Sequence, residues 1–279
     1  MDVAVSRRLA LLVLPLVVSL AGCDMAHLAA KASDEWTHTY PLNAGGEIRI
    51  VNTNGTVDVE GVDGNTVEIR AEKIARSATE DAARELLPRI NIKEEKSADR
   101  ISLETERMSG IMIGASFEVQ YHVRAPRNAV INVTNTNGLV TVKAMSGQVT
   151  AHTTNGGVKG TNLSGAVDAR TTNGGVSVDM ASVGSGRISL ETTNGGVTLA
   201  LPEKAKASIS AACTNGGISV GSLDNFEVSE HSRRHLEGKL NGGGTAIDLQ
   251  TTNGGIRLRS HNSLPDAPRE TDSDDRKDR

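Results

Sequence analysis

Acidic side chains are among the residues of this 279-residue sequence that could perform acid–base catalysis. A pair of carboxylates facing a substrate cleaves glycosidic bonds, for example. Four acids could line one outer face of the folded chain, namely Asp168, Asp179, Glu191 and Asp248. They alternate with threonine and serine, as on an ordinary polar surface, and the chain has only one Trp, two Tyr and two Phe on which a sugar could stack. A polysaccharide-cleaving enzyme therefore remains a disfavoured alternative, and no catalytic residue is predicted.

Metal and cofactor sites are disfavoured by the surroundings of their candidate residues. His231 and His235, in "HSRRH", have the spacing that lets two histidines on a helix bind one metal. The segment instead predicts an irregular loop without a nearby carboxylate, so we interpret them as a surface pair. Glu80 and Asp81 fit the first turn of a helix, where they favour its dipole. The glycine-rich turns lead into strands rather than helices, and Val or Ile follows their glycines where calcium-binding repeats have Asp. No metal and no cofactor is predicted.

Cys23 is the residue with the clearest predicted chemistry. It ends "LAGC", which follows two arginines and an apolar run, Leu9–Leu20, that is too short to span a bilayer comfortably. These features are typical of a secretory signal peptide over residues 1–22. The box resembles a bacterial lipobox, and the resemblance implies that Cys23 carries a diacylglyceryl thioether and an acylated amino terminus. Such acyl chains, palmitate among them, would anchor the chain firmly to a membrane.

Neighbouring residues bear on where the protein acts. Asp24 follows the lipid site and suggests the periplasmic face of the inner membrane, by a rule that varies between bacterial lineages. The sequence "SRRLALL" partly resembles a twin-arginine signal, so the export route stays open. The 30 basic and 34 acidic residues nearly balance, which gives no reason to expect nucleic acid as a partner. The expected partners are the membrane, through the lipid, and an envelope protein or polysaccharide.

A repeated word, T-N-G-x-[VI], dominates the rest of the chain. Its asparagines are Asn54, Asn137, Asn155, Asn173, Asn194, Asn215 and Asn253. From Asn137 onward they are separated by 18, 18, 21, 21 and 38 residues, and the last gap fits two turns of about 19. No active site needs so many copies of one turn, whereas a chain that stacks on itself does. The repeat therefore predicts a parallel β-helix in which each word forms one corner.

The strand before each corner alternates apolar and polar residues, and alternate side chains point to opposite faces of a strand. The apolar parity also contains the first Thr of each word, which predicts an inner ladder of Thr153, Thr171, Thr192, Cys213 and Thr251. Asparagine follows on the same parity, so we expect an inward ladder of amides that hydrogen-bond along the stack, formed by Asn137, Asn155, Asn173, Asn194, Asn215 and Asn253. Cys213 is thus interpreted as structural.

The chain divides into five predicted segments. Residues 1–22 are the signal peptide, and 23–40 are the lipidated amino terminus and a tether. Residues 41–135 form alternating strands interrupted by a helix over 77–88, which Ser77 caps and Pro88 ends. Residues 136–259 form the repeat, and 260–279 are a polar, charged tail expected to be disordered.

The ordered series "NTNGTVDVEG", "VQYHVRAPRNAVINVTNTNGLVTV" and "LNGGGTAIDLQTTNGGIRL" resembles the bacterial "putative-adhesin" family, a β-helix class of unknown function. The likeness covers residues 40–259 apart from the helix. It implies an all-β, right-handed, single-stranded parallel β-helix with coils of 18–21 residues, and it carries no catalytic residues. We expect a lipid-anchored, non-catalytic binding module of the cell envelope. A scaffold that self-assembles through its coil edges is the alternative.

Overall fold

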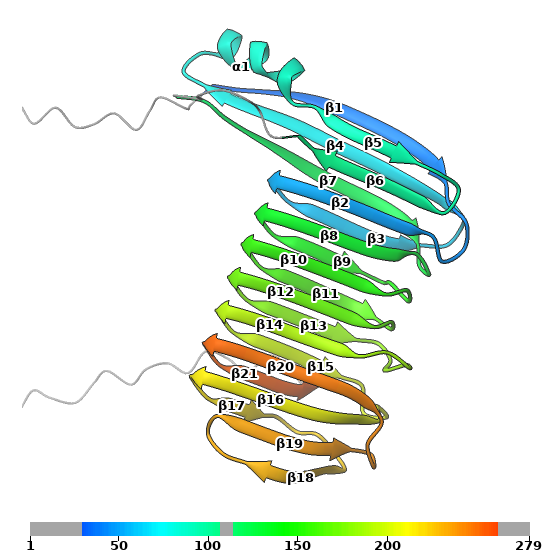
Figure 1. The fold of residues 1–279 in the computed structure, drawn as a ribbon, viewed down its shortest axis with the longest axis vertical. Helices are drawn as coiled ribbons and strands as arrows, with labels where there is room; N and C mark the ends of the chain where they lie inside the picture. Colours follow the sequence, from blue (N-terminus) through cyan, green and yellow to red (C-terminus); the bar gives the residue numbers. More distant parts are fainter. Residues whose placement is uncertain (1–29, 107–113, 262–279) are drawn as a thin grey trace, which may run out of the picture.

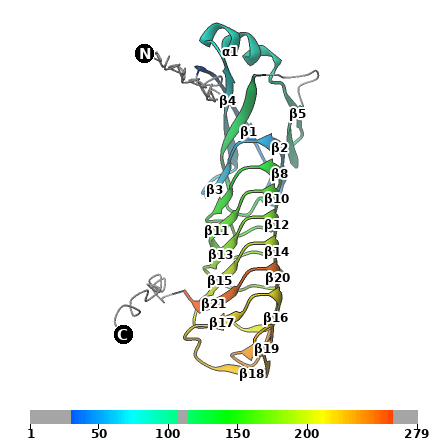
Figure 2. The same ribbon diagram turned by 90° about the vertical axis from the view of Figure 1, so that its left-hand side faces the viewer.

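The computed structural model describes residues 30–106 and 114–261. Two long sheets face each other along one axis, and the chain passes back and forth between them (Figures 1 and 2). The first sheet has ten strands and the second sheet has eleven. The described residues are thus almost wholly β, which agrees with the all-β class predicted from the alternating sequence.

Each coil of the repeat region gives one strand to each sheet. In this region the second sheet contains β8 (Val130–Asn137), β10 (Val149–Asn155), β12 (Val167–Asn173), β14 (Ile188–Asn194), β16 (Ala207–Asn215) and β20 (Thr245–Asn253). The strands of the first sheet are β9 (Val140–Lys143), β11 (Val158–Leu163), β13 (Val176–Met180), β15 (Val197–Leu201), β17 (Ile218–Val220) and β21 (Ile256–Ser260). The repeated word forms the corner between the two strands of a coil.

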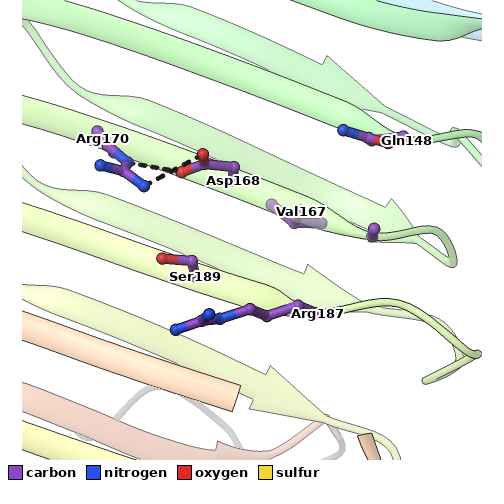
Figure 3. Close-up of a pocket in the computed structure, with 7 residues that line it drawn as sticks. Gln148, Val167, Asp168, Arg170, Arg187 and Ser189 are labelled. Atoms are coloured by element: carbon purple, nitrogen blue, oxygen red, sulfur yellow. Dashed lines mark hydrogen bonds and ion pairs between the residues drawn. The ribbon is translucent and has the colours of Figure 1, made fainter. Parts of the chain in front are cut away.

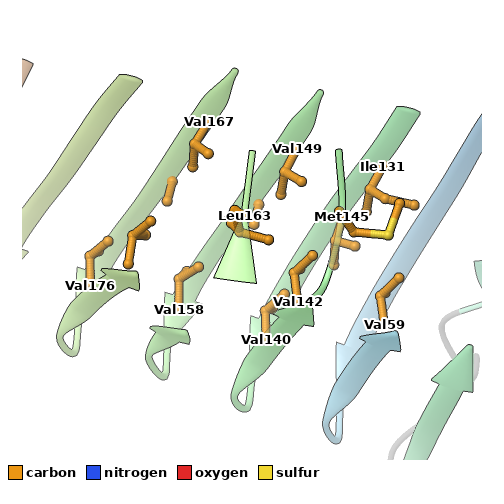
Figure 4. Packing of buried hydrophobic residues seen from close by; sticks show 14 of the residues in the cluster. Val59, Ile131, Val140, Val142, Met145, Val149, Val158, Leu163, Val167 and Val176 are labelled. Carbon is orange, nitrogen blue, oxygen red and sulfur yellow. The ribbon is translucent and has the colours of Figure 1, made fainter. Parts of the chain in front are cut away.

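The core is the space between the two sheets, filled by the apolar parity of each strand. Valines and other aliphatic side chains from both sheets point toward one another, including Val149 and Val167 from the second sheet and Val158 and Val176 from the first (Figure 4). The strands pair in parallel and in register, so that Val149 lies beside Val167. Each aliphatic side chain buried in this way contributes about 1.5–3 kcal/mol. The predicted alternation and the predicted stacking of like residues are confirmed.

The order of the coils differs from the order of the sequence at one place. In the second sheet, β20 lies between β14 and β16, and in the first sheet β21 lies between β15 and β17. Figure 1 shows the orange β20 among yellow strands that precede it in the chain. The expectation that the 38-residue gap before Asn253 contains two further turns is therefore wrong. The coil of β16 and β17 therefore does not contact the preceding coil of β14 and β15 through strand pairing. The later coil of β20 and β21 lies between these two coils.

At the amino-terminal end of the stack the strand pairing changes from parallel to antiparallel. β2 (Glu47–Asn54) and β3 (Val57–Val62) form the first coil. Beyond it, the first sheet continues with β7 (Ser116–Pro126), β4 (Thr66–Ser77) and β1 (Ala30–Pro41), and the second sheet with β6 (Arg100–Thr105) and β5 (Ile92–Lys96). β1 pairs along its whole length with β4. The prediction of a tether up to residue 40 is thus wrong for the described part, because residues 30–40 belong to this strand.

The one helix of the described residues, α1 (Glu80–Leu86), lies over this end and is followed by the 3₁₀ turn η2 (Leu87–Arg89). The predicted helix exists, but its cap is Thr79, whose hydroxyl accepts a hydrogen bond from the Ala82 amide at 3.2 Å. Ser77, the predicted cap, is buried at the end of β4. Glu80 and Asp81 occupy the first turn as expected.

The other end of the stack is closed by a hairpin of β18 (Phe226–His231) and β19 (His235–Leu240), which packs against β16. Leu236 and Leu240 of β19 are buried in the core. The irregular loop predicted around "HSRRH" is therefore wrong, because this segment contains the turn of a β-hairpin and the ends of its two strands. The sequence does not reveal the hairpin because β18 is exposed along nearly its whole length and alternates only at Phe226 and Val228.

The predicted membrane anchor concerns residues outside the described part of the chain. No helix among residues 30–106 and 114–261 is long and apolar enough to cross a membrane. The predicted signal peptide, Cys23 and the predicted tail beyond residue 261 lie outside the described residues. The right-handed sense of the coil and its length of 18–21 residues stay predictions from the sequence.

Candidate functional site

The asparagines of the repeated word form a continuous ladder along one edge of the stack. Each side-chain Nδ2 donates to the Oδ1 of the asparagine in the neighbouring coil, over 2.7–2.9 Å. The order of the ladder is Asn215, Asn253, Asn194, Asn173, Asn155, Asn137 and Asn54. The structure thus brings together all six asparagines singled out from the sequence, and adds Asn54.

The expectation that these amides point into the core is wrong, because all six predicted asparagines are exposed. Asparagine is the last residue of its strand, and in most coils the glycine after it has a positive φ, such as +150° at Gly174. The chain turns there, so the alternation of the strand no longer decides where the side chain points. The ladder lies at the surface of the corner, where water can also reach its amides.

The residues of the inner ladder lie two positions before the asparagines in the same strands, and they are buried. The hydroxyls of Thr153, Thr171, Thr192 and Thr251 donate to the carbonyl of the first corner glycine in the neighbouring coil, over 2.7–3.3 Å. Cys213 occupies the same position in the last coil, and its Sγ lies 3.9 Å from the Arg233 carbonyl. The inner ladder is buried and uses its hydroxyls within the chain, whereas the exposed asparagine ladder spends one N–H group of each amide on its neighbour.

Two residues that the sequence reasoning missed extend this inner ladder. Asn135 lies beside Thr153 in register, and Asn52 lies beside Asn135. Both side chains are buried, and Asn135 donates to the Gly55 carbonyl over 2.9 Å. The signal was the spelling "NTNG", in which asparagine replaces the usual first threonine.

The groups left for a ligand lie on the outer face of the second sheet, where strand register lines them up in two rows. The acid row contains Thr150, Asp168, Ser189, Asp248, Ser210, Glu237 and Glu230. The mixed row, two residues further along each strand, contains His152, Arg170, Glu191, Gln250, Ala212 and His235. The sequence predicted the outward parity of the repeat strands, which is confirmed, but not which residues are neighbours across β20.

Ion pairs connect the acid row to the arginines beside it. Arg170 Nε lies 2.8 Å from Asp168 Oδ1, and another guanidinium nitrogen lies 3.6 Å from Glu191 Oε2. The hydrogen bond to Asp168 and the attraction of its charge raise the pKa of the Arg170 guanidinium. Arg187, which precedes β14, pairs with Asp248 of β20 over 2.8 Å. His152 Nε2 lies 3.5 Å from Asp168 but makes no hydrogen bond.

A depression of about 450 Å³ lies on this face between the coils of β12 and β14. Its lining includes Gln148, Asp168, Arg170, Arg187 and Ser189 (Figure 3). Both arginines lie beside the depression and present N–H groups, while the glutamine and the serine add uncharged donors and acceptors. Such a surface can hydrogen-bond a polar partner without burying it.

Three of the four acids weighed as catalytic groups share one outer face, and the fourth lies on the other sheet. Asp168, Glu191 and Asp248 lie on the second sheet, and each is paired with an arginine. Asp179 lies on β13 of the first sheet, where its Oδ1 is 2.5 Å from His261 Nδ1. His231 and His235 are both on the end hairpin, and Glu230 and Glu237 lie close to His235, contrary to the expectation that no carboxylate is near.

Residues 132–259 match the family Toastrack DUF4097. Among solved structures, a "putative cell adhesion protein" from Clostridium sporogenes is 12% identical, with a TM-score of 0.45, over 82% of this chain and 100% of that one. A "putative adhesin" from Bacteroides fragilis is 10% identical, with a TM-score of 0.28, over 81% of this chain and 97% of that one.

No curated protein matches the chain in sequence. The family match spans the strands from β8 to β21, which include most of the asparagine ladder and of both outer rows. Residues 132–259, somewhat less than half of the 279-residue chain, thus resemble the Toastrack DUF4097 family, a domain of unknown function.

Proposed function

We propose that this protein is an exported, lipid-anchored module of the bacterial cell envelope that binds a partner through the outer face of its second sheet and performs no catalysis. The observation that carries this proposal is the pair of outer rows. They place charged and hydroxyl side chains at the regular spacing of parallel strands, about 4.8 Å, across a rigid face. An extended polar partner, such as a polysaccharide or an acidic and basic protein surface, fits such an array.

The ion pairs support binding rather than catalysis. A general acid or a nucleophile must be free to exchange a proton or attack a substrate. Asp168 and Asp248 are instead held by Arg170 and Arg187 over 2.8 Å. Paired arginines and carboxylates on a surface can exchange these contacts for contacts with a partner, which favours electrostatic recognition.

The closed ends of the stack argue against the alternative of a self-assembling scaffold. Solenoids join end to end when an open coil offers unpaired strand edges. Here the sheets are extended at the amino-terminal end by strands whose outermost pairs, β1 with β4 and β5 with β6, are antiparallel. At the other end the β18–β19 hairpin extends the second sheet, and the first sheet ends at β17, an edge strand of only three residues.

Anchoring by Cys23 is part of this proposal and rests on the sequence. A Cys23→Ser variant, expressed in a bacterial host, is expected to leave the membrane fraction because it lacks the acylated thiol. An immunoblot of separated membrane and periplasmic fractions measures this. Continued fractionation with membranes would remove the anchor from the proposal. The face on which the protein lies, suggested by Asp24, can be read from protease accessibility in spheroplasts.

Binding is tested by reversing charge on one face at a time. The face variant is Arg170→Glu with Arg187→Glu on the second sheet, and the control is Lys159→Glu with Arg257→Glu on the exposed side of the first sheet. Purified protein is sedimented with peptidoglycan sacculi. The face variant is expected to lose most of the bound protein, while the control binds like the parent. Equal binding by both variants would show that the second sheet is not the binding face.

A protein partner is tested in intact cells with a photo-cross-linking residue. It replaces Ser189 on the outer face of the second sheet or, as the matched control, Ser177 on the first sheet. The proposal expects a discrete cross-linked species from position 189 that is absent from position 177. The proposed face is contradicted if two results coincide. These are sacculi binding that does not depend on Arg170 and Arg187, and no cross-linked species from position 189.

A further inference from the structure

The hairpin that closes the carboxyl-terminal end of the stack gathers three metal-binding side chains. Glu230 comes from β18, and His235 and Glu237 come from β19. Their ligand atoms all lie within 4.8 Å of one another. His235 Nε2 is 3.4 Å from a Glu237 oxygen and 3.8 Å from a Glu230 oxygen. Two ligands bound about 2.1 Å from a tetrahedral zinc ion are about 3.4 Å apart, so these distances are close to those of a formed site.

The register of the hairpin brings two carboxylates together in a way that needs a counter-charge. Glu230 lies directly opposite Glu237, just after a register shift that follows Val228. Like charges directly opposite each other destabilise an antiparallel pair. Among the described residues, no lysine or arginine lies within ion-pair distance of either carboxylate, and His235 is the basic group beside both. A divalent cation held by all three side chains would remove this repulsion.

We propose that Glu230, His235 and Glu237 form a binding site for Zn²⁺. The donor set favours zinc over magnesium or calcium, because an imidazole nitrogen is a good ligand for zinc while the other two ions prefer oxygen ligands alone. The side chains are 63%, 36% and 51% exposed, respectively, so water can complete the coordination. Three protein ligands and an open position give a site that exchanges its ion readily.

The site joins the two strands of the terminal hairpin. β18 is the outermost strand of the second sheet and pairs only with β19. Coordination by Glu230 from β18 and by two residues from β19 would fasten this edge strand to the stack. Zinc is therefore expected to slow amide exchange in β18, with little change in the coils between β8 and β14.

The test is a calorimetric titration of the untagged, EDTA-treated protein with ZnCl₂. The parent protein is expected to bind one zinc ion at a saturable site and to bind no magnesium when MgCl₂ replaces zinc. Glu237→Gln, which keeps the shape of an exposed side chain, is expected to weaken zinc binding by about tenfold or more. His231→Ala is the matched control, because it removes the other histidine of the hairpin and leaves the three ligands in place.

Amide exchange with and without ZnCl₂ supplies the second readout, in which β18 is protected in the parent and not in Glu237→Gln. Two results would overturn the proposal. One is the absence of saturable zinc binding by the parent, and the other is an equal affinity in the parent and in Glu237→Gln. A loss of binding in His231→Ala alone would assign the metal to the histidine pair instead.

Discussion

At the scale of the residue, the ladder of exposed asparagines contributes less stability than a buried one would. Asn194 donates to Asn173 and accepts from Asn253. Each bond contributes about 0.5–1.5 kcal/mol, and water can partly replace both after truncation. Asn194→Ala is therefore expected to lower the free energy of unfolding by about 1 kcal/mol, as measured by urea denaturation. A loss above about 3 kcal/mol would indicate that the amides are buried after all.

The corner glycines differ sharply in what they tolerate. At Gly174, φ is +150° and an added Cβ would lie 2.0 Å from the Gly156 carbonyl oxygen, whereas at Gly175 its nearest neighbour would be 3.4 Å away. Gly174→Ala is expected to destabilise the protein by about 3 kcal/mol, through strain and overlap. Gly175→Ala is the control and is expected to change stability little. Equal melting temperatures for the two variants would contradict the corner geometry.

The sequence predicted these ladders because their residues repeat, but it did not predict the direction of the asparagines. Alternation along a strand decides the direction of Thr192, which lies within β14, and fails for Asn194, which ends that strand. Of the proposed zinc ligands, His235 was weighed from the sequence, but its two carboxylate neighbours were not. Glu230 is brought beside His235 by a hairpin turn, and the alternation of β18 stops after Val228.

At the scale of the element, the strands that end the repeat are structurally central. β20 pairs with β14 on one side and β16 on the other, and β21 lies in the same way between β15 and β17. Since the chain fills this position last, a protein ending at residue 244 would lack a coil from the middle of its stack. It is expected to lose protection from proteolysis throughout β16 to β19.

A protein ending at residue 261 is the control for that truncation, because it keeps every described strand. Limited proteolysis followed by mass spectrometry compares the two. Loss of the truncated strands alone, with β16 still protected, would show that the coils stack in chain order. The sequence could not reveal the inserted coil. All corners share nearly the same residues, so each coil could pair with any other coil.

At the scale of the whole molecule, the two ends of the stack are expected to keep molecules from associating. The amino-terminal end finishes in the antiparallel pairs β1–β4 and β5–β6, and Glu227 and Glu230 place charges on the outermost strand at the other end. Charged edge strands discourage pairing between molecules. The Cys23→Ser protein is therefore expected to sediment as a monomer across a hundredfold range of concentration. Filaments or a concentration-dependent mass would favour the scaffold.

The overall architecture was predicted from the sequence, because a period of 18–21 residues with alternation inside it leaves few folds available. The ends of the stack were predicted less well. β1 was taken for a tether because its polar residues outnumber its apolar ones, and only Ala32 and Tyr40 are buried. Such strands are recognised by the partner they pair with, which a single sequence does not reveal.

Residue-resolved amide hydrogen exchange tests the stacked arrangement most directly. The structure gives β20 hydrogen-bonded neighbours on both sides and gives β18 one neighbour only. Amides of β20 are therefore expected to exchange as slowly as those of β12 and about a hundredfold more slowly than those of β18. Exchange of β20 at the rate of β18 would contradict the account, because it would mean that the last repeat lies at an edge.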